Sequence, residues 1–132
     1  MTVSHSAKLL LFLTIAALAV FITVYSFYPR SAEPGEVSVT IRMGEYYFTP
    51  NEIHVRKNVK IHLIFLNDGA YPHNAYLSEK KTELVTILYP SNVTTVEVMF
   101  TETGVYNILC TIAYPAPVSH YELGMRAKLV VE

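Results

Sequence analysis

The chain has 132 residues, of which 52% are hydrophobic and 16% are charged, and its formal net charge is −1. This length is typical of one domain, and the high apolar content argues against intrinsic disorder. Acidic and basic residues are mixed from Glu36 onward. The sequence therefore lacks the basic patch expected of a protein that binds nucleic acid or anionic lipid.

The N-terminal segment, residues 1–28, contains an apolar run from Leu9 to Tyr28 without a charge. About 20 apolar residues are needed for a helix to cross the roughly 30 Å hydrocarbon core of a membrane. A cleaved secretory signal is the alternative, but its apolar stretch is usually only about 7 to 15 residues long and ends at small residues. We therefore expect a retained transmembrane helix at residues 9–28 that anchors the chain in the cell membrane by a single pass, with the C-terminal part on the periplasmic or extracellular face.

Residues 29–35 contain two prolines and a glycine, which predicts a short linker. Period-2 alternation of apolar and polar residues begins immediately after it, as expected of strands with one buried face. The domain at residues 36–132 reads as a series of short strands with no helical period between them, which predicts an all-β sandwich or barrel. The expected strands are 36–43, 52–56, 60–66, 75–77, 84–88, 93–100, 104–110 and 126–131, with a bend at 46–51.

Several side chains can be assigned to the core or the surface from this alternation. Met43 and Met99 fall within strand patterns and are expected in the core. His54 and His62 are out of phase with their apolar neighbours and are expected on the opposite face. Tyr106, which follows Gly104 and Val105, suggests a tyrosine corner, in which a buried hydroxyl bonds back to nearby backbone in Greek-key sandwiches.

The C-terminal quarter of the chain carries a possible metal-binding set. The only cysteine, Cys110, is followed by His120 and Met125, and His73 lies upstream after a proline. One thiolate, two imidazoles and a thioether suit a copper ion, because soft sulfur combined with imidazole nitrogen favours copper over hard cations. A single cysteine also excludes an internal disulfide, and metal ligation would explain how an unpaired thiol survives outside the cytoplasm.

Short motifs spread over residues 36–132 resemble cupredoxin signatures, in particular those of the plastocyanin, amicyanin and pseudoazurin group. The motifs are Phe48-Thr49-Pro50, Asn67, Pro72-His73-Asn74, Gly104-x-Tyr106-x-x-x-Cys110 and His120-x-x-x-Gly124-Met125.

The resemblance implies a Greek-key β-sandwich with one type 1 copper ion that cycles between Cu(I) and Cu(II). It implies that His73 and His120 bind the metal through nitrogen, Cys110 through its thiolate and Met125 axially. It also assigns to Asn74 the role of tying the ligand loops together and donating to the sulfur.

One feature departs from these relatives. Nine residues, 111–119, separate Cys110 from His120, where the relatives usually have two to four. A binuclear copper centre also uses a longer loop but needs a second cysteine within it, which this chain lacks. The loop is mostly apolar and uncharged, so Tyr114, Pro115, Pro117 and Val118 are expected to form a docking surface or the cover over one. The alternative is a loop that only fills space over the core.

These observations favour an electron-transfer protein rather than an enzyme, with redox proteins such as a cytochrome, an oxidase or another respiratory component as partners. Two alternatives remain open. One is a component of a terminal oxidase or respiratory complex that resembles subunit II. The other is a copper storage or delivery protein, which would bind Cu(I) without the intense colour of a type 1 Cu(II) site.

Overall fold

The computed structural model describes residues 35–132. The anchor predicted at residues 9–28 lies outside the described part of the chain. Within residues 35–132, no helix is long and apolar enough to cross a membrane.

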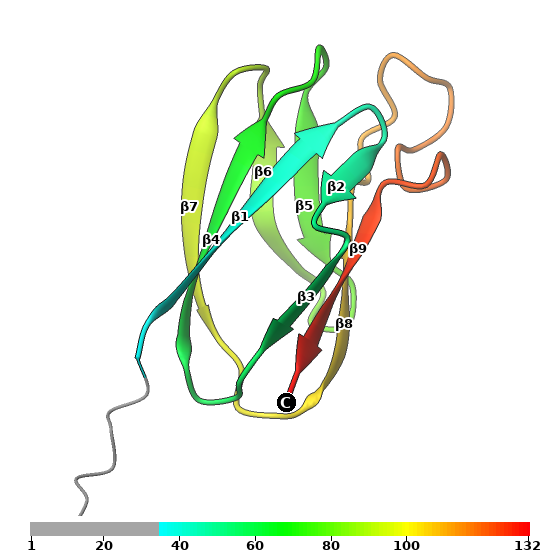
Figure 1. The fold of residues 1–132 in the computed structure, drawn as a ribbon. Helices are drawn as coiled ribbons and strands as arrows, with labels where there is room; N and C mark the ends of the chain where they lie inside the picture. Colours follow the sequence, from blue (N-terminus) through cyan, green and yellow to red (C-terminus); the bar gives the residue numbers. More distant parts are fainter. Residues whose placement is uncertain (1–34) are drawn as a thin grey trace, which may run out of the picture. The chain divides into compact units, whose positions relative to one another are not determined.

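Two β-sheets pack face to face in the described residues, as the alternation of apolar residues predicts (Figure 1). One sheet has the strand order β2-β1-β4-β7, and the other has the order β3-β9-β8-β5-β6. The strands are β1 (Val37–Gly44), β2 (Tyr47–Thr49), β3 (Glu52–Val55), β4 (Lys60–Asn67), β5 (His73–Leu77), β6 (Thr82–Leu88), β7 (Val93–Met99), β8 (Gly104–Leu109) and β9 (Arg126–Val131). The parallel pairs β1–β4 and β3–β9 join segments that are distant in the sequence.

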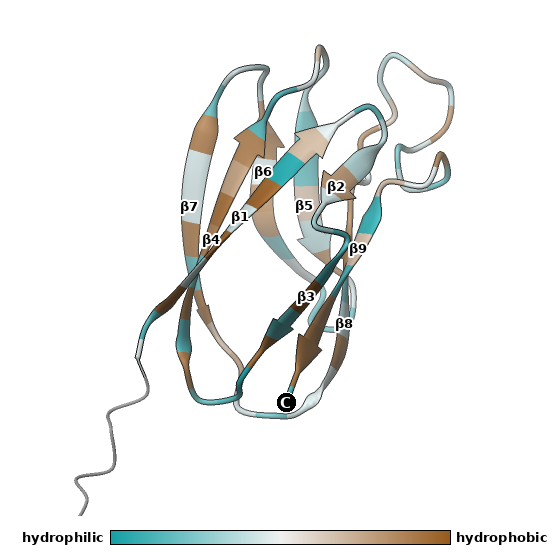
Figure 2. Cartoon of the chain, in the orientation of Figure 1, coloured by the Kyte–Doolittle hydropathy of each residue, from teal (hydrophilic) through white to brown (hydrophobic). Residues whose placement is uncertain are grey.

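Strand β4 shows how the alternation builds the core. Ile61, Leu63 and Phe65 are fully buried, while the residues between them are only partly covered. Removing such a side chain from water stabilises the fold by about 1.5 to 3 kcal/mol. Inward-facing residues of the second sheet, including Ile108 and Leu129, meet them from the other side. Figure 2 shows that β4 is largely hydrophobic along its length, whereas other strands, such as β1, carry hydrophobic and hydrophilic stretches.

The predicted bend at residues 46–51 is wrong in part, because it contains strand β2. Phe48 of β2 pairs with Met43 of β1, and both side chains are buried. A strand of three residues is too short to show an alternation of apolar and polar residues in the sequence. Its extended conformation is stabilised by burial of the Phe48 ring in the core. This pairing creates a tight turn at Glu45 and Tyr46 between β1 and β2.

Met43 is buried as predicted, but the prediction for Met99 is wrong because this side chain is 61% exposed. In β7 the more buried phase contains Val96 and Val98, so Met99 follows on the outward phase. His54 is exposed and His62 is partly exposed, as their phase predicts.

The tyrosine corner is confirmed. Tyr106 is 6% exposed, and its hydroxyl donates a hydrogen bond to the carbonyl oxygen of Glu102 at 3.2 Å. Its ring packs on Phe100 with 4.7 Å between the ring centroids. The bond fixes the chain as it enters β8, the strand that leads to Cys110.

Tyr106→Phe should lower the free energy of unfolding by about 1 kcal/mol, because it removes one partly buried hydrogen bond while keeping the ring. Urea unfolding of the full chain measures this change. Tyr89→Phe removes a hydroxyl from a side chain that is 57% exposed and should have no measurable effect. Equal stability of the two variants would contradict a structural role for the Tyr106 hydroxyl.

Candidate metal centre

Three of the four predicted ligand positions lie at the same end of one sheet. His73 is the first residue of β5, Cys110 follows the last residue of β8, and Met125 precedes β9. Strand β8 pairs with both β5 and β9, so the sheet register brings these three positions together. The amide of Cys110 also donates to the carbonyl oxygen of Met125 at 3.2 Å.

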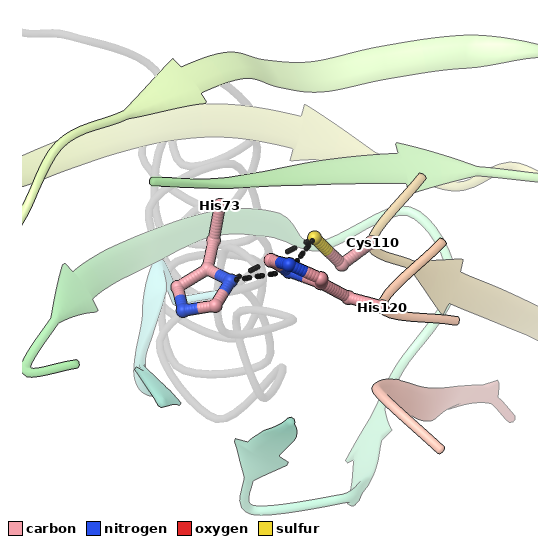
Figure 3. A group of neighbouring side chains, drawn as sticks. All are labelled: His73, Cys110 and His120. Atoms are coloured by element: carbon pink, nitrogen blue, oxygen red, sulfur yellow. Dashed lines mark hydrogen bonds between the residues drawn. The ribbon is translucent and has the colours of Figure 1, made fainter. Parts of the chain in front are cut away.

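The side chains of His73, Cys110 and His120 point toward one another in a site with no exposure to solvent (Figure 3). The two Nδ1 atoms are 3.0 Å apart. The sulfur of Cys110 lies 3.4 Å from Nδ1 of His120 and 3.8 Å from Nδ1 of His73. Three donor atoms from three separate segments therefore surround one point.

These separations fit a single metal ion of the first transition row. Bond lengths of about 2.0 Å to nitrogen and about 2.3 Å to sulfur place donor atoms about 3.3 to 3.7 Å apart in tetrahedral or trigonal geometry. The observed separations of 3.0, 3.4 and 3.8 Å lie close to that range. A thiolate with two imidazoles is also the donor set of type 1 copper sites, in which a thioether is a weak fourth ligand.

Met125 is fully buried, and its backbone forms hydrogen bonds with two of the residues that carry donor atoms, Cys110 and His120. Besides accepting from Cys110, it donates its amide to the carbonyl oxygen of His120 at 2.9 Å. The backbone of His120 is held in turn by Ile112, whose carbonyl oxygen accepts the His120 amide at 2.8 Å. His120 is thus fixed although it comes from a loop.

One contact indicates which ring nitrogen carries the proton in the neutral tautomer of His120. Its Nε2 lies 2.7 Å from the carbonyl oxygen of Tyr114. A carbonyl can only accept a hydrogen bond, so the proton of a neutral His120 is on Nε2 and the lone pair of Nδ1 faces the other donors. Tyr114 therefore holds His120 in the form that can bind a metal through Nδ1.

Burial favours the uncharged forms of both donors, which suits metal binding at His73 but opposes it at Cys110. Loss of hydration, followed by the nearby charge of His120, lowers the pKa of His73 from 6.5 to about 4, so its imidazole is neutral at neutral pH. Burial also raises the pKa of the Cys110 thiol, an effect that the amide of Asn74 opposes. A bound metal would have to displace the thiol proton.

Asn74 makes the contacts that the resemblance implies. Its amide lies 3.5 Å from the sulfur of Cys110. Its side-chain carbonyl accepts from the amide of Thr111 at 2.7 Å, and its side-chain nitrogen donates to the Thr111 hydroxyl at 2.8 Å. The segments that carry His73 and Cys110 are thereby locked to each other.

The loop of residues 111–119 covers His120, which has no exposed surface. The side chains of Tyr114 and Val118 are 62% and 38% exposed, and Pro115 and Pro117 are also exposed. The carbonyl group of Tyr114 therefore faces the ligand, while these four side chains are exposed. Ile112 at the start of the loop packs against the core instead.

Two contacting residues carry no signal in the sequence. Glu45 and Tyr46 form the turn between β1 and β2, and each lies against one histidine. A carboxylate oxygen of Glu45 is 3.9 Å from Nε2 of His73, and the ring of Tyr46 packs on that of His120 with 4.7 Å between centroids. Their position depends on the short strand β2, which has no readable period.

Comparisons with known proteins agree with this fold. Residues 14–131 match the family model of the cupredoxin-like domain, so the chain belongs to that family. Among curated protein sequences, none matches this chain.

Three solved structures illustrate the range of structural likeness. Auracyanin A, a "blue" copper protein from Chloroflexus aurantiacus, is 22% identical with a TM-score of 0.61, over 74% of this chain and 100% of that chain. A reduced amicyanin mutant is 22% identical with a TM-score of 0.51, over 72% and 82%. A chain from a heme-copper terminal oxidase dimer is 16% identical with a TM-score of 0.57, over 97% and 100%.

The low pKa of His73 predicts acid sensitivity of the protein after its metal has been removed with a chelator. Below pH 6.5 the unfolded chain takes up a proton at His73, whereas the folded chain does so only near pH 4. Stability should therefore fall by up to about 3 kcal/mol between pH 7 and pH 4. Urea unfolding at several pH values measures this, and His73→Gln should lose that part of the slope. Identical slopes for parent and variant would contradict the assignment.

Proposed function

We propose that this chain is a mononuclear type 1 copper protein that carries single electrons between redox partners at the outer face of a membrane. The observation that carries the proposal is the convergence of one thiol and two imidazole nitrogens within 4.8 Å in a fully buried site. Copper supplies a one-electron couple when bound by His73, Cys110, His120 and Met125. No bond of a substrate needs to change.

The protein's contribution to electron transfer is a fixed set of ligand positions. Cys110 and His73 stand at the ends of neighbouring strands and are locked by Asn74. His120 is held at its backbone by Ile112 and at its ring by Tyr114. Because these contacts involve buried backbone groups, the donors can keep one geometry in both oxidation states, which keeps reorganisation small.

The copper assignment predicts that Cys110→Ser loses the intense visible band of the Cu(II)-loaded protein, because the thiolate is the source of that charge-transfer absorption. Visible and EPR spectra of parent and variant test this. His54→Gln is the matched control, since His54 is an exposed histidine outside the cluster, and it should retain the full spectrum. An intense band with narrow copper hyperfine splitting in Cys110→Ser would refute the assignment.

A second function is favoured by the extent of one structural match. The chain from the heme-copper terminal oxidase dimer covers 97% of this chain and is itself covered completely, whereas the blue copper proteins match over about three quarters of it. This supports, as a second candidate, a subunit that is permanently docked in a terminal oxidase. The apolar run at residues 9–28 is compatible with a mobile carrier on an anchor and with a fixed subunit.

One fractionation experiment tests the anchor and separates the two candidates. Membranes are washed with high salt, which screens surface charge but does not extract a spanning helix, and we expect the protein to stay in the pellet. Mild detergent then releases it. Purification alone supports the mobile carrier, whereas stoichiometric co-purification with heme proteins supports the subunit. Soluble material with a mature N-terminus at residues 31–35 would refute the retained anchor.

The loop of residues 111–119 is the part of the site that a redox partner would meet first. In relatives the edge of the second histidine is the usual exit for electrons, but here His120 is completely covered. The exposed side chains of Tyr114 and Val118, with Tyr121 and Leu123 beside the same ligand, offer an apolar surface. We infer that partners dock on this loop, in a small contact of the kind that transient redox complexes form.

Tyr114→Lys should slow electron exchange with the physiological partner about tenfold, because burying an unpaired polar group costs about 1 to 3 kcal/mol. The copper spectrum should not change, because the hydrogen bond to His120 comes from the backbone carbonyl group of Tyr114. Stopped-flow kinetics measures the rate. The control is Met99→Lys, which alters a similarly exposed apolar residue at the end of β7. That end of β7 lies at the opposite end of the sandwich from the 111–119 loop (Figure 1). Equal rates for both variants would place docking elsewhere.

A further inference from the structure

The imidazole of His73 has one nitrogen that the donor cluster leaves unexplained. Its Nδ1 faces Nδ1 of His120 and the sulfur of Cys110. Its Nε2 is buried and has no hydrogen-bond partner among residues 35–132. Once Nδ1 gives its lone pair to a metal, the proton of the neutral ring has to be on Nε2. A buried N–H without an acceptor is costly, by about 1 to 3 kcal/mol.

The nearest charged group to this nitrogen is the side chain of Glu45, whose Oε1 is 3.9 Å away. That distance is about 1 Å longer than a hydrogen bond, so a small side-chain movement joins the two groups. The same oxygen accepts from the amides of Ala70 and Tyr71 at 2.5 and 3.1 Å. The carboxylate is therefore held by backbone and is not a freely rotating surface group.

Gly69 makes room for this carboxylate. A Cβ at position 69 would collide with Oε1 of Glu45. Gly69 is in turn positioned by Asn67, whose side-chain oxygen accepts its amide at 3.0 Å. The loop before His73 is thus shaped to admit the Glu45 carboxylate beside the histidine.

The charge of Glu45 is also less neutralised than that of the other acidic residue in this region. Asp68 accepts a hydrogen bond from Nε of Arg42 at 2.7 Å and pairs with the same guanidinium. Within the described residues, Glu45 forms no ion pair with a lysine or arginine, and the only basic side chain within 4 Å of its carboxylate is the imidazole of His73. Its negative charge therefore acts mainly on the histidine.

We propose that Glu45 is a positioning residue that accepts the Nε2 proton of His73 in the copper-bound protein and lowers the reduction potential of the site. The inference rests on the proposed function. A carboxylate behind a ligating histidine fixes the tautomer and ring orientation and makes the ring a stronger donor. It also adds a negative charge near the metal, which stabilises Cu(II) more than Cu(I).

The test compares Glu45→Gln with the parent in the copper-loaded full chain. Glutamine keeps an oxygen for the amides of Ala70 and Tyr71 but removes the charge. We expect the preference for Cu(I) over Cu(II) to rise about tenfold, at the low end of typical effects of such partners because Glu45 is partly exposed. For one electron this equals a potential about 59 mV higher. Glu97→Gln, which removes an exposed carboxylate on β7, should shift the potential much less.

A second variant and a second readout separate charge from position. Gly69→Ala keeps the carboxylate but pushes it away from its place, so it should raise the potential by a smaller amount in the same direction. In the diamagnetic Cu(I) protein, the Nε2 proton of His73 should move upfield in nitrogen-edited NMR spectra of both variants, because its acceptor is weakened or displaced.

The outcomes distinguish this inference from the function on which it rests. An unchanged potential and an unchanged His73 Nε2 proton in Glu45→Gln, with the copper spectrum intact, would overturn the role of Glu45 alone. A parent protein that binds copper without a type 1 spectrum would overturn the proposed function and this inference with it.

Discussion

Three metal-binding atoms are buried together away from solvent, and the rest of this end of the molecule depends on that constraint. Two imidazole nitrogens and a thiol sulfur lie within 4.8 Å of one another with no solvent contact. Buried polar groups are costly unless they find partners. The pKa of His73 is lowered and that of Cys110 is raised for this reason. The hydrogen bonds of Asn74, Tyr114 and Ile112 hold these donors in place.

The two sheets and the loops divide this task between them. Strand pairing in one sheet fixes Cys110 and the neighbouring Met125. His120 comes from an irregular segment, yet its amide, its carbonyl group and its ring nitrogen all have backbone partners. A long connection between Cys110 and His120 is therefore tolerated, because backbone hydrogen bonds close it at the ligand end regardless of its length.

The parts of the fold with strict alternation could be predicted from the sequence, since burial of one strand face enforces a period of two. Strand β4 and the tyrosine corner at Tyr106 are examples. Strand β2 could not be predicted, because three residues cannot show a period. Membership of a strand alone does not place Met99 in the core, because Val96 and Val98 set the opposite phase.

The donor residues could be named from their chemical types and order, but the groups around them could not. Glu45 precedes His73 by 28 positions, and only the pairing of β2 with β1 forms the turn that brings it there. The sequence predicts that the 111–119 loop forms a docking surface or the cover over one, but not that the loop holds the ring of His120, because this depends on a contact made by a backbone carbonyl group.

That contact has a consequence for how the protein can change over evolutionary time. The loop holds His120 through the carbonyl group of Tyr114 and the carbonyl group of Ile112, which every amino acid possesses. The side chains of these two residues take no part in those bonds, and that of Tyr114 is exposed, whereas that of Ile112 packs against the core. Mutation can therefore remodel the surface of the loop for a new partner while the geometry of the ligand beneath it is inherited unchanged.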